Sequence, residues 1–294
     1  MGAARYSFHL RFHLGTISGN HHRQVLQTYT ESTCETHYRI GHLVSRVKRD
    51  EFYPQTYYLQ LKRYEQIFFD LDGTLWDIQT NSKLALREIF FELFPEQHEM
   101  QFDNFYKSYQ KWNERLWTAY RKNQITKEQL RTSRFEKALS GAKLPFNSHV
   151  IENMAGSFLE RCPALPNLMP GAKELLDHCA HRYRIHIITN GFKEVQEIKM
   201  QSSGILNYFD HFFYSEDVGV KKPHPEIFHK ALEKCQCSTK DVLMIGDDWG
   251  ADIIGARNVG IDQVYYNPKT IADRRHNYIP TYHIHHLLKL KEIL

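Results

Sequence analysis

The sequence has little that marks a membrane-spanning, secreted or nucleic-acid-binding protein. Its 294 residues contain no run approaching the roughly 18 consecutive apolar residues of a membrane-spanning helix. No apolar stretch near Met1 resembles a secretory signal. The net charge is only +4, and most of this surplus falls within residues 1–60, which argues against a basic face that grips nucleic acid. We therefore expect a cytoplasmic protein that contacts neither a membrane nor a nucleic acid polymer.

Cysteine is also scarce, and its pattern is irregular. The five cysteines are Cys34, Cys162, Cys179, Cys235 and Cys237. Cys235 and Cys237 flank a single residue, which is too tight for the usual zinc-binding or redox spacings. Reduced thiols of a cytosolic protein are the expected state.

The first part of the chain differs from the rest. Residues 1–60 have no acidic residue before Glu31, no proline before Pro54 and no sustained period of 2 or 3.6 in their apolar positions. We predict a disordered or non-native extension without a role in chemistry. An organelle-targeting segment and a true start near Leu61 are the alternatives.

Short apolar runs alternate with helical patterns in most of the remaining chain. The predicted strands are Gln66–Phe69, Tyr183–Ile188, His211–Tyr214, Val242–Ile245 and Gln263–Tyr266, and the predicted helices between the later ones are Pro170–Ala180, Glu194–Ser203, Pro225–Lys234 and Ala251–Asn258. Strands and helices that alternate in this way predict an α/β fold, with a Rossmann-like parallel sheet and helices on both faces.

One interval contains only helical patterning. Residues 78–166 include Thr126 followed three positions later by Gln129, which is typical of a capping box. We predict that 78–166 form an inserted, all-helical cap domain, and that 61–77 and 167–294 form the core domain.

The first predicted strand ends in two acidic residues. In an extended segment residues i and i+2 point the same way, so Asp70 and Asp72 are expected to face one cavity while Gly73 turns the chain away. Two neighbouring carboxylates must share a proton or a cation, which suits a nucleophile beside a general acid/base. Asp-Gly-Thr is also common turn chemistry.

Groups that bind anions follow the next two predicted strands. Thr189 and Asn190 precede Gly191 and are candidates for phosphate binding. Lys222, held before Pro223, is placed to aim a positive charge at the same edge of the sheet. A turn in the first case and a solvated lysine in the second are the structural alternatives.

A further acidic group follows the fourth predicted strand. Asp247 joins Asp70 and Asp72 as a candidate ligand of Mg²⁺, which prefers carboxylate oxygens. Asp248 and Asp252 are candidates for the metal or for support of its ligands, and Asp252 is equally suited to capping the following helix.

The four strand ends together indicate transfer of a phosphoryl group. Positive charge from Mg²⁺ and Lys222 is expected to screen a phosphate ester from an attacking carboxylate. Asp70 is the predicted nucleophile, which forms an aspartyl-phosphate. Asp72 is the predicted acid that protonates the leaving oxygen, and then the base that activates water.

At this point the chain resembles the haloacid dehalogenase superfamily, whose four motifs match in order between Tyr64 and Leu294. The resemblance implies a Mg²⁺-dependent phosphatase with Asp70 as nucleophile and Asp72 as acid/base, the latter also offering its backbone carbonyl to the metal. It further implies that Thr189 and Lys222 hold the phosphate, that Asp247 completes the metal site, and that the helical insert is a mobile cap. Haloalkanoic acid dehalogenases do not need an acid at the position of Asp72.

A closer resemblance is to the bacterial noncanonical pyrimidine nucleotidases of that superfamily. The segments that carry it are 113–117 with Tyr120, 125–126, 134–135, 188–192, 215–220 and 280–282. It implies a 5′-nucleotidase that acts on pyrimidine (deoxy)nucleoside monophosphates, including noncanonical ones. The alternatives are a phosphatase for a small sugar phosphate or phosphoglycolate, and a catalytically dead binding module. We expect a monomer or a weak homodimer.

The helical segment offers a few candidates for substrate contact. Asn113, Trp117 and Tyr120 form a stripe beside the apolar positions that predict the core of their helix. Trp117 is suited to stacking on a base and Asn113 to bonding the edge of that base. Arg134 is the preferred cation of the predicted cap.

Overall fold

The computed structural model describes residues 64–269 and 279–294. These residues belong to one compact unit, Leu59–Leu294. The predicted extension, residues 1–60, lies outside the described residues, as does Cys34. In the described part of the chain, no helix is long and apolar enough to cross a membrane.

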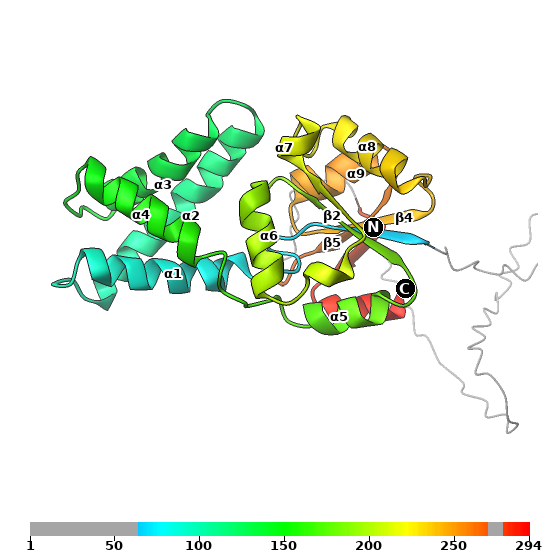
Figure 1. The fold of residues 1–294 in the computed structure, drawn as a ribbon, viewed down its shortest axis with the longest axis horizontal. Coiled ribbons are helices and arrows are strands. Elements are labelled where there is room, and N and C mark those ends of the chain that lie inside the picture. Colours follow the sequence, from blue (N-terminus) through cyan, green and yellow to red (C-terminus); the bar gives the residue numbers. More distant parts are fainter. Residues whose placement is uncertain (1–63, 270–278) are drawn as a thin grey trace, which may run out of the picture. The chain divides into compact units, whose positions relative to one another are not determined.

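A parallel sheet forms the centre of the fold (Figure 1). Its strands are β1 (Gln66–Phe69), β2 (Arg184–Thr189), β3 (His211–Tyr214), β4 (Val242–Gly246), β5 (Asp262–Tyr266) and β6 (Tyr282–Ile284). Their spatial order is β3-β2-β1-β4-β5-β6, and every neighbouring pair is parallel. The predicted fold class is therefore confirmed, and β6 is an additional strand that the apolar runs did not indicate.

Alternating side chains of β1 explain why both faces of the sheet are covered. Ile67 and Phe69 belong to one hydrophobic cluster, whereas Phe68 belongs to another. The first cluster includes residues of α5 (Ala172–Cys179) and the second includes residues of α8 (Pro225–Cys235). Figure 1 shows these two helices on opposite sides of the strands.

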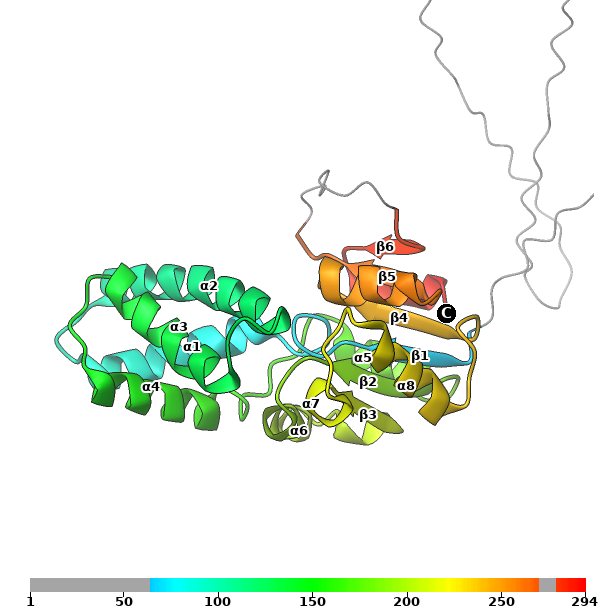
Figure 2. The same cartoon turned by 90° about the horizontal axis from the view of Figure 1, so that it is seen from above.

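Four helices occupy the chain between β1 and α5. They are α1 (Ile78–Leu93), α2 (Glu99–Arg121), α3 (Lys127–Gly141) and α4 (Ser148–Arg161). They lie together beside the strands in Figure 2, and buried aromatic rings such as Phe90, Phe105 and Phe135 fill the space between them. The capping box of Thr126 and Gln129 is confirmed. We call these four helices the helical segment; its status as a separate cap domain, with the boundaries given above, stays a prediction.

The remaining helices connect the strands, except for η3, which follows β6. They are α6 (Lys193–Ser202), η1 (Leu206–Tyr208), α7 (Ser215–Val218), η2 (Trp249–Ile254), α9 (Gly255–Asn258) and η3 (Leu287–Glu292). The helix expected over Ala251–Asn258 begins earlier, since Asp248 accepts hydrogen bonds from the backbone N–H groups of Gly250 and Ala251 and caps the wider turn η2.

Candidate active site

The predicted strand-end residues line a single cavity with a volume of about 350 Å³. Its walls combine the carboxyl ends of the strands with the helical segment, as expected for a ligand site in a parallel sheet. The predicted site residues that line it are Asp70, Asp72, Asn113, Trp117, Arg134, Thr189, Asn190, Lys222, Asp247, Asp248 and Asp252. Residues from six separate stretches of the chain therefore meet in one place.

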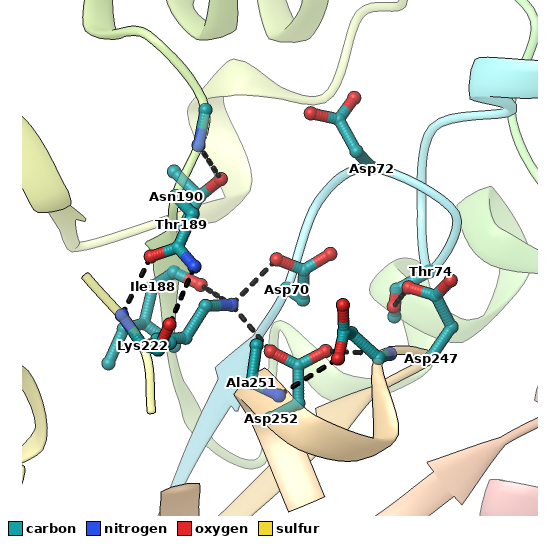
Figure 3. A network of polar contacts seen from close by, with 12 residues as sticks. Asp70, Asp72, Thr74, Ile188, Thr189, Asn190, Lys222, Asp247, Ala251 and Asp252 are labelled. Carbon is teal, nitrogen blue, oxygen red and sulfur yellow. Dashed lines mark hydrogen bonds and ion pairs between the residues drawn. The ribbon is translucent and has the colours of Figure 1, made fainter. Parts of the chain in front are cut away.

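Lys222 lies at the centre of the strand-end wall (Figure 3). Its ammonium group lies 2.7 Å from Asp70 Oδ1 and 2.7 Å from Asp252 Oδ1, and it donates to the carbonyl oxygen of Ile188 at 2.6 Å. The residue is only 1% exposed. Burial disfavours the ammonium ion, but the carboxylates of Asp252 and Asp70 outweigh burial and raise the pKa of Lys222. Lys222 therefore stays charged and faces the predicted nucleophile.

Asn190 positions this lysine, and its contact with phosphate stays a prediction, because the second N–H of its amide is left to donate into the cavity. Asn190 Nδ2 donates to the backbone carbonyl of Lys222 at 2.9 Å, while Asn190 Oδ1 accepts from the Lys222 backbone N–H at 2.8 Å. Both functional groups of the amide are thus used to hold the backbone of Lys222. The position of Asn190 at a strand end did not by itself show that its amide would hold the backbone of Lys222.

The hydroxyl group of Thr189 keeps a free donor. Its Oγ1 accepts from the backbone N–H of Gly191 at 3.0 Å and from Gln196 Nε2 at 2.7 Å. Two accepted bonds occupy both lone pairs of a hydroxyl oxygen, so its proton is left to donate. Thr189 lines the cavity, where an anion would be the acceptor.

Asp72 is held by two residues of α6 that the sequence patterns did not single out. Lys199 Nζ lies 2.7 Å from Asp72 Oδ1, and Gln196 Nε2 donates to Asp72 Oδ2 at 3.0 Å. Lys199 also donates to Gln196 Oε1 at 2.8 Å and lies over the ring of Trp76. Positions three apart share one face of a helix, but nothing local indicates that this face meets Asp72.

Three carboxylates gather at the ends of β1 and β4. Oxygen atoms of Asp70, Asp247 and Asp252 lie within 4.8 Å of one another. Burial raises the pKa of Asp247 well above its ordinary value, and repulsion from Asp70 and Asp252 raises it further. Burial also raises the pKa of Asp252, to about 7. Burial also raises the pKa of Asp70, against the opposing effect of Lys222. Carboxylate oxygens in such a cluster fit a hard divalent cation such as Mg²⁺, which would relieve the repulsion.

Asp248 and Asp252 divide the two roles that the sequence left open. Asp248 caps η2, and its Oδ2 pairs with Arg121 of α2 at 3.1 Å. Asp252 does not cap the helix: its Oδ2 accepts from the Asp248 backbone N–H at 3.0 Å, and its Oδ1 contacts Lys222. Asp252 therefore belongs to the carboxylate cluster, and Asp248 links that turn to the helical segment.

Two glycines allow the acidic loops to approach one another. Gly73 has a φ of +91°, and a Cβ atom at this position would lie 2.5 Å from Asp247 Oδ2. At Gly246 a Cβ atom would lie 2.3 Å from Asp252 Oδ2. Since real Cβ atoms do not come so close, larger residues at either position would displace a carboxylate of the cluster.

The helical segment contributes a different kind of wall. The rings of Trp117 and Phe192 stack with centroids 5.5 Å apart. Arg134 Nη1 donates to Asn113 Oδ1 at 3.4 Å, and its Nε is buried without a hydrogen-bond partner. Among the described residues no carboxylate pairs with Arg134, so this buried cation has charge available for a ligand.

Tyr120 is the one predicted contact residue that does not line the cavity. It is buried and packs with its ring against Phe192 and Trp117, at 5.6 and 5.7 Å between centroids. Tyr120 therefore supports the aromatic wall from behind.

Comparisons with known proteins agree with this geometry. A family model described as haloacid dehalogenase-like hydrolase matches residues 64–260. The chain belongs to the haloacid dehalogenase-like hydrolases, and the resemblance stated above is confirmed together with the predicted hydrolase class.

Individual relatives cover most of the described chain. "Putative HAD-hydrolase YfnB" of Bacillus subtilis (strain 168) is 32% identical over 239 residues, which is 80% of this chain and 97% of the relative. "Pyrimidine 5'-nucleotidase YjjG" of Escherichia coli (strain K12) is 32% identical over 237 residues, or 79% and 98% of the two chains. "Glyceraldehyde 3-phosphate phosphatase" of Pyrococcus abyssi (strain GE5 / Orsay) is 31% identical over 201 residues, or 68% and 80%.

A solved structure supports the same assignment. The crystal structure of YfnB, described as bound to magnesium and as revealing interdomain movement, has a TM-score of 0.70 at 29% identity. It covers 79% of this chain and 99% of its own. A magnesium-bound member of the family with this fold agrees with the donor set of the carboxylate cluster.

Proposed function

We propose that this chain is a Mg²⁺-dependent phosphomonoester hydrolase, and that its substrates are pyrimidine (deoxy)nucleoside monophosphates. The observation that carries the proposal is one cavity in which a carboxylate bound to a buried lysine, a free hydroxyl donor and a second, fixed carboxylate face an aromatic wall. The family and its phosphatase members support the hydrolytic part.

The first step is attack by Asp70 on phosphorus. Lys222 binds Asp70 Oδ1, which leaves Oδ2 to form the new O–P bond. Lys222 and the Thr189 hydroxyl would hold the phosphoryl oxygens, and Asp72 gives its proton to the ester oxygen as the P–O bond to the alcohol breaks. The products of this step are the free alcohol, a nucleoside for a nucleotide substrate, and an aspartyl-phosphate.

The second step restores the carboxylate. Asp72, now ionised, takes a proton from a water molecule whose oxygen attacks phosphorus, and the Asp70–phosphorus bond breaks to release inorganic phosphate. Lys199 and Gln196 are positioning residues in both steps, because their bonds fix the direction of the Asp72 carboxylate.

The metal site would be formed by Asp70, Asp247 and the backbone carbonyl of Asp72, with Asp252 beside them. When bound, Mg²⁺ supplies the positive charge that screens the phosphoryl group from the carboxylate that attacks it.

The nucleotide part of the proposal rests on the helical segment. Trp117 offers an aromatic face to a base, and Asn113 and Arg134 offer polar groups to its edge. A cavity of about 350 Å³ is within the usual range for a small-molecule site. The relative that is named a pyrimidine 5′-nucleotidase supports this substrate class.

A small sugar phosphate is the second candidate substrate, because one relative is named a glyceraldehyde 3-phosphate phosphatase. The test is phosphate release from dUMP, dTMP, purine monophosphates, sugar phosphates and phosphoglycolate, each with Mg²⁺ and with a chelator. We expect the highest kcat/KM for the pyrimidine monophosphates and loss of activity with the chelator. Preference for a sugar phosphate or phosphoglycolate contradicts the nucleotidase assignment, and failure to hydrolyse any of them contradicts the phosphatase assignment.

A further inference from the structure

A second group of potential metal ligands lies away from the cavity. His186 of β2 and His211, the first residue of β3, are paired in the parallel register of these strands. Their rings are nearly parallel, with centroids 5.3 Å and planes 14° apart. Cys235, the last residue of α8, approaches from the helix that covers this face of the sheet. His186 precedes Thr189 by three residues, or about 10 Å along a strand, so the group lies well back from the strand ends.

The donor atoms of these residues converge. One ring nitrogen of each histidine and the Cys235 Sγ atom all lie within 4.8 Å of one another. Ligands of a tetrahedral zinc ion lie about 3.3 to 3.7 Å apart, as calculated from its usual bond lengths. His186 and Cys235 are buried, whereas His211 is partly exposed. The partial exposure of His211 provides a path for an ion.

Hydrogen bonding around His186 fixes which nitrogen is free. Gln66 Nε2 donates to the backbone carbonyl of Cys235 at 3.2 Å, and a carbonyl only accepts, so Gln66 Oε1 must face His186 Nε2, which lies 2.9 Å away. That oxygen accepts a hydrogen bond from the Nε2–H group, which makes Nε2 the protonated nitrogen of the neutral ring. The lone pair of a neutral His186 is therefore on Nδ1.

The Nδ1 atom of His186 is buried and has no hydrogen-bond partner. His186 is 0% exposed, so water does not satisfy this atom from the surface. An imidazole that donates one N–H to an oxygen and directs the other lone pair inward is the usual arrangement of a metal-bound histidine.

We propose that His186, His211 and Cys235 bind a zinc ion that joins β2 and β3 to α8. Two imidazole nitrogens and a thiolate suit Zn²⁺ and poorly suit Mg²⁺, which prefers oxygen. The fourth position falls to water or to Cys237, which lies two residues beyond Cys235 in the chain. The site is structural, since it lies behind the strand ends.

The test is Co²⁺ titration of the full chain, followed by displacement with Zn²⁺, because a cobalt ion bound by a thiolate shows charge-transfer absorption that oxygen ligands do not produce. We expect one equivalent with such a band in the wild type, and no band in Cys235→Ser. In His211→Gln the affinity should fall at least about tenfold. Zn²⁺ should raise the Tm of the wild type, raise that of His211→Gln by less, and leave that of Cys235→Ser unchanged.

Cys179→Ser is the matched control, because it removes a described, buried thiol outside this group. It should keep the cobalt band. Circular dichroism checks that each variant is folded, and His211→Gln, at a partly exposed position, keeps the test decisive if Cys235→Ser does not fold. The proposal is overturned if the wild type shows no thiolate band, if the band survives in a folded Cys235→Ser protein, or if a folded His211→Gln protein binds Co²⁺ as tightly as the wild type.

Discussion

The two walls of the cavity are built from opposite chemistries. On the strand-end wall each charged group is already bonded to a partner: Lys222 to Asp70 and Asp252, and Lys199 to Asp72. On the helical wall Arg134 has no carboxylate partner among the described residues, and Trp117 offers an aromatic ring. The strand ends thus hold a reaction centre that is organised before a ligand binds. The helices hold groups whose interactions are completed only when a ligand binds.

This difference indicates how chemistry and selectivity are separated. Changes at the strand ends should affect every substrate alike, because all substrates share the phosphoryl group. Changes on the helical wall should affect the hydrolysis of different substrates to different extents, because substrates differ in the part of the molecule that is not the phosphoryl group. The two walls are joined by ion pairs such as Lys127 with Glu194 and Glu216, at 2.8 and 2.7 Å. Partly exposed pairs of this kind are worth little individually, so the connection is weak compared with either wall.

The largest expected effect follows from removal of the nucleophile. Asp70→Asn keeps the shape of the side chain but not its nucleophilic oxygen, so phosphate release should fall by about three orders of magnitude or more for every substrate. Asp177→Asn, the same change at an exposed aspartate, should leave the rate unchanged. Equal rates for Asp70→Asn and the wild type would support a binding module without catalysis.

A glycine pair tests whether the carboxylate cluster needs its close packing. Gly73→Ala places a Cβ atom 2.5 Å from Asp247 Oδ2, and misplacement of this carboxylate should lower kcat by about a hundredfold. Gly204→Ala imposes a similar backbone strain at a φ of +69° with no atom within 4 Å, so it should cost stability but not kcat. Steady-state kinetics and thermal denaturation of both variants separate the two effects, and equal kcat values would contradict this role of Gly73.

Lys199 tests whether the second carboxylate must be held in place. Lys199→Met should lower kcat by about tenfold with little change in KM, because Asp72 loses its fixed direction but keeps its acid/base function. Lys199→Arg should restore part of the loss. Lys193→Met, on the same helix but paired with Asp217 at the surface, is the control. A rise in KM alone would instead place Lys199 in substrate binding.

Trp117 tests the other wall. Trp117→Ala should raise KM for a pyrimidine monophosphate about tenfold, within the range of base stacking on an aromatic ring. KM for a small sugar phosphate should not change. Trp112→Ala removes an indole of the same helix that does not line the cavity, and should change neither value. A similar loss for both substrates would remove the distinction between the walls.

The smallest effect concerns metal and pH. The pKa of Asp252 is raised to about 7, so the folded chain holds this proton more tightly than the unfolded chain. The contribution of protonated Asp252 to the free energy of unfolding is therefore present at low pH and is lost as the pH rises through about 7. Mg²⁺ should consequently raise Tm more at pH 8 than at pH 5.5. Asp247→Asn should reduce that difference, and an equal Mg²⁺ effect at both pH values would contradict a metal site at this cluster.

The sequence by itself determined the parallel sheet, the capping box of Thr126 and the strand ends that carry Asp70, Thr189, Lys222 and Asp247. These features depend on short-range rules, since alternation in a strand and capping of a helix involve residues only a few positions apart. The carboxyl ends of parallel strands meet at one edge, so the shared cavity was also predictable.

Only the tertiary structure decided what each polar group bonds to. It assigned Asn190 to the backbone of Lys222, Asp252 to the carboxylate cluster rather than the helix cap, and Lys199 to Asp72. The last pair is 127 positions apart in the chain. No local pattern encodes which helix face meets which strand end, because that is fixed by packing of the whole core.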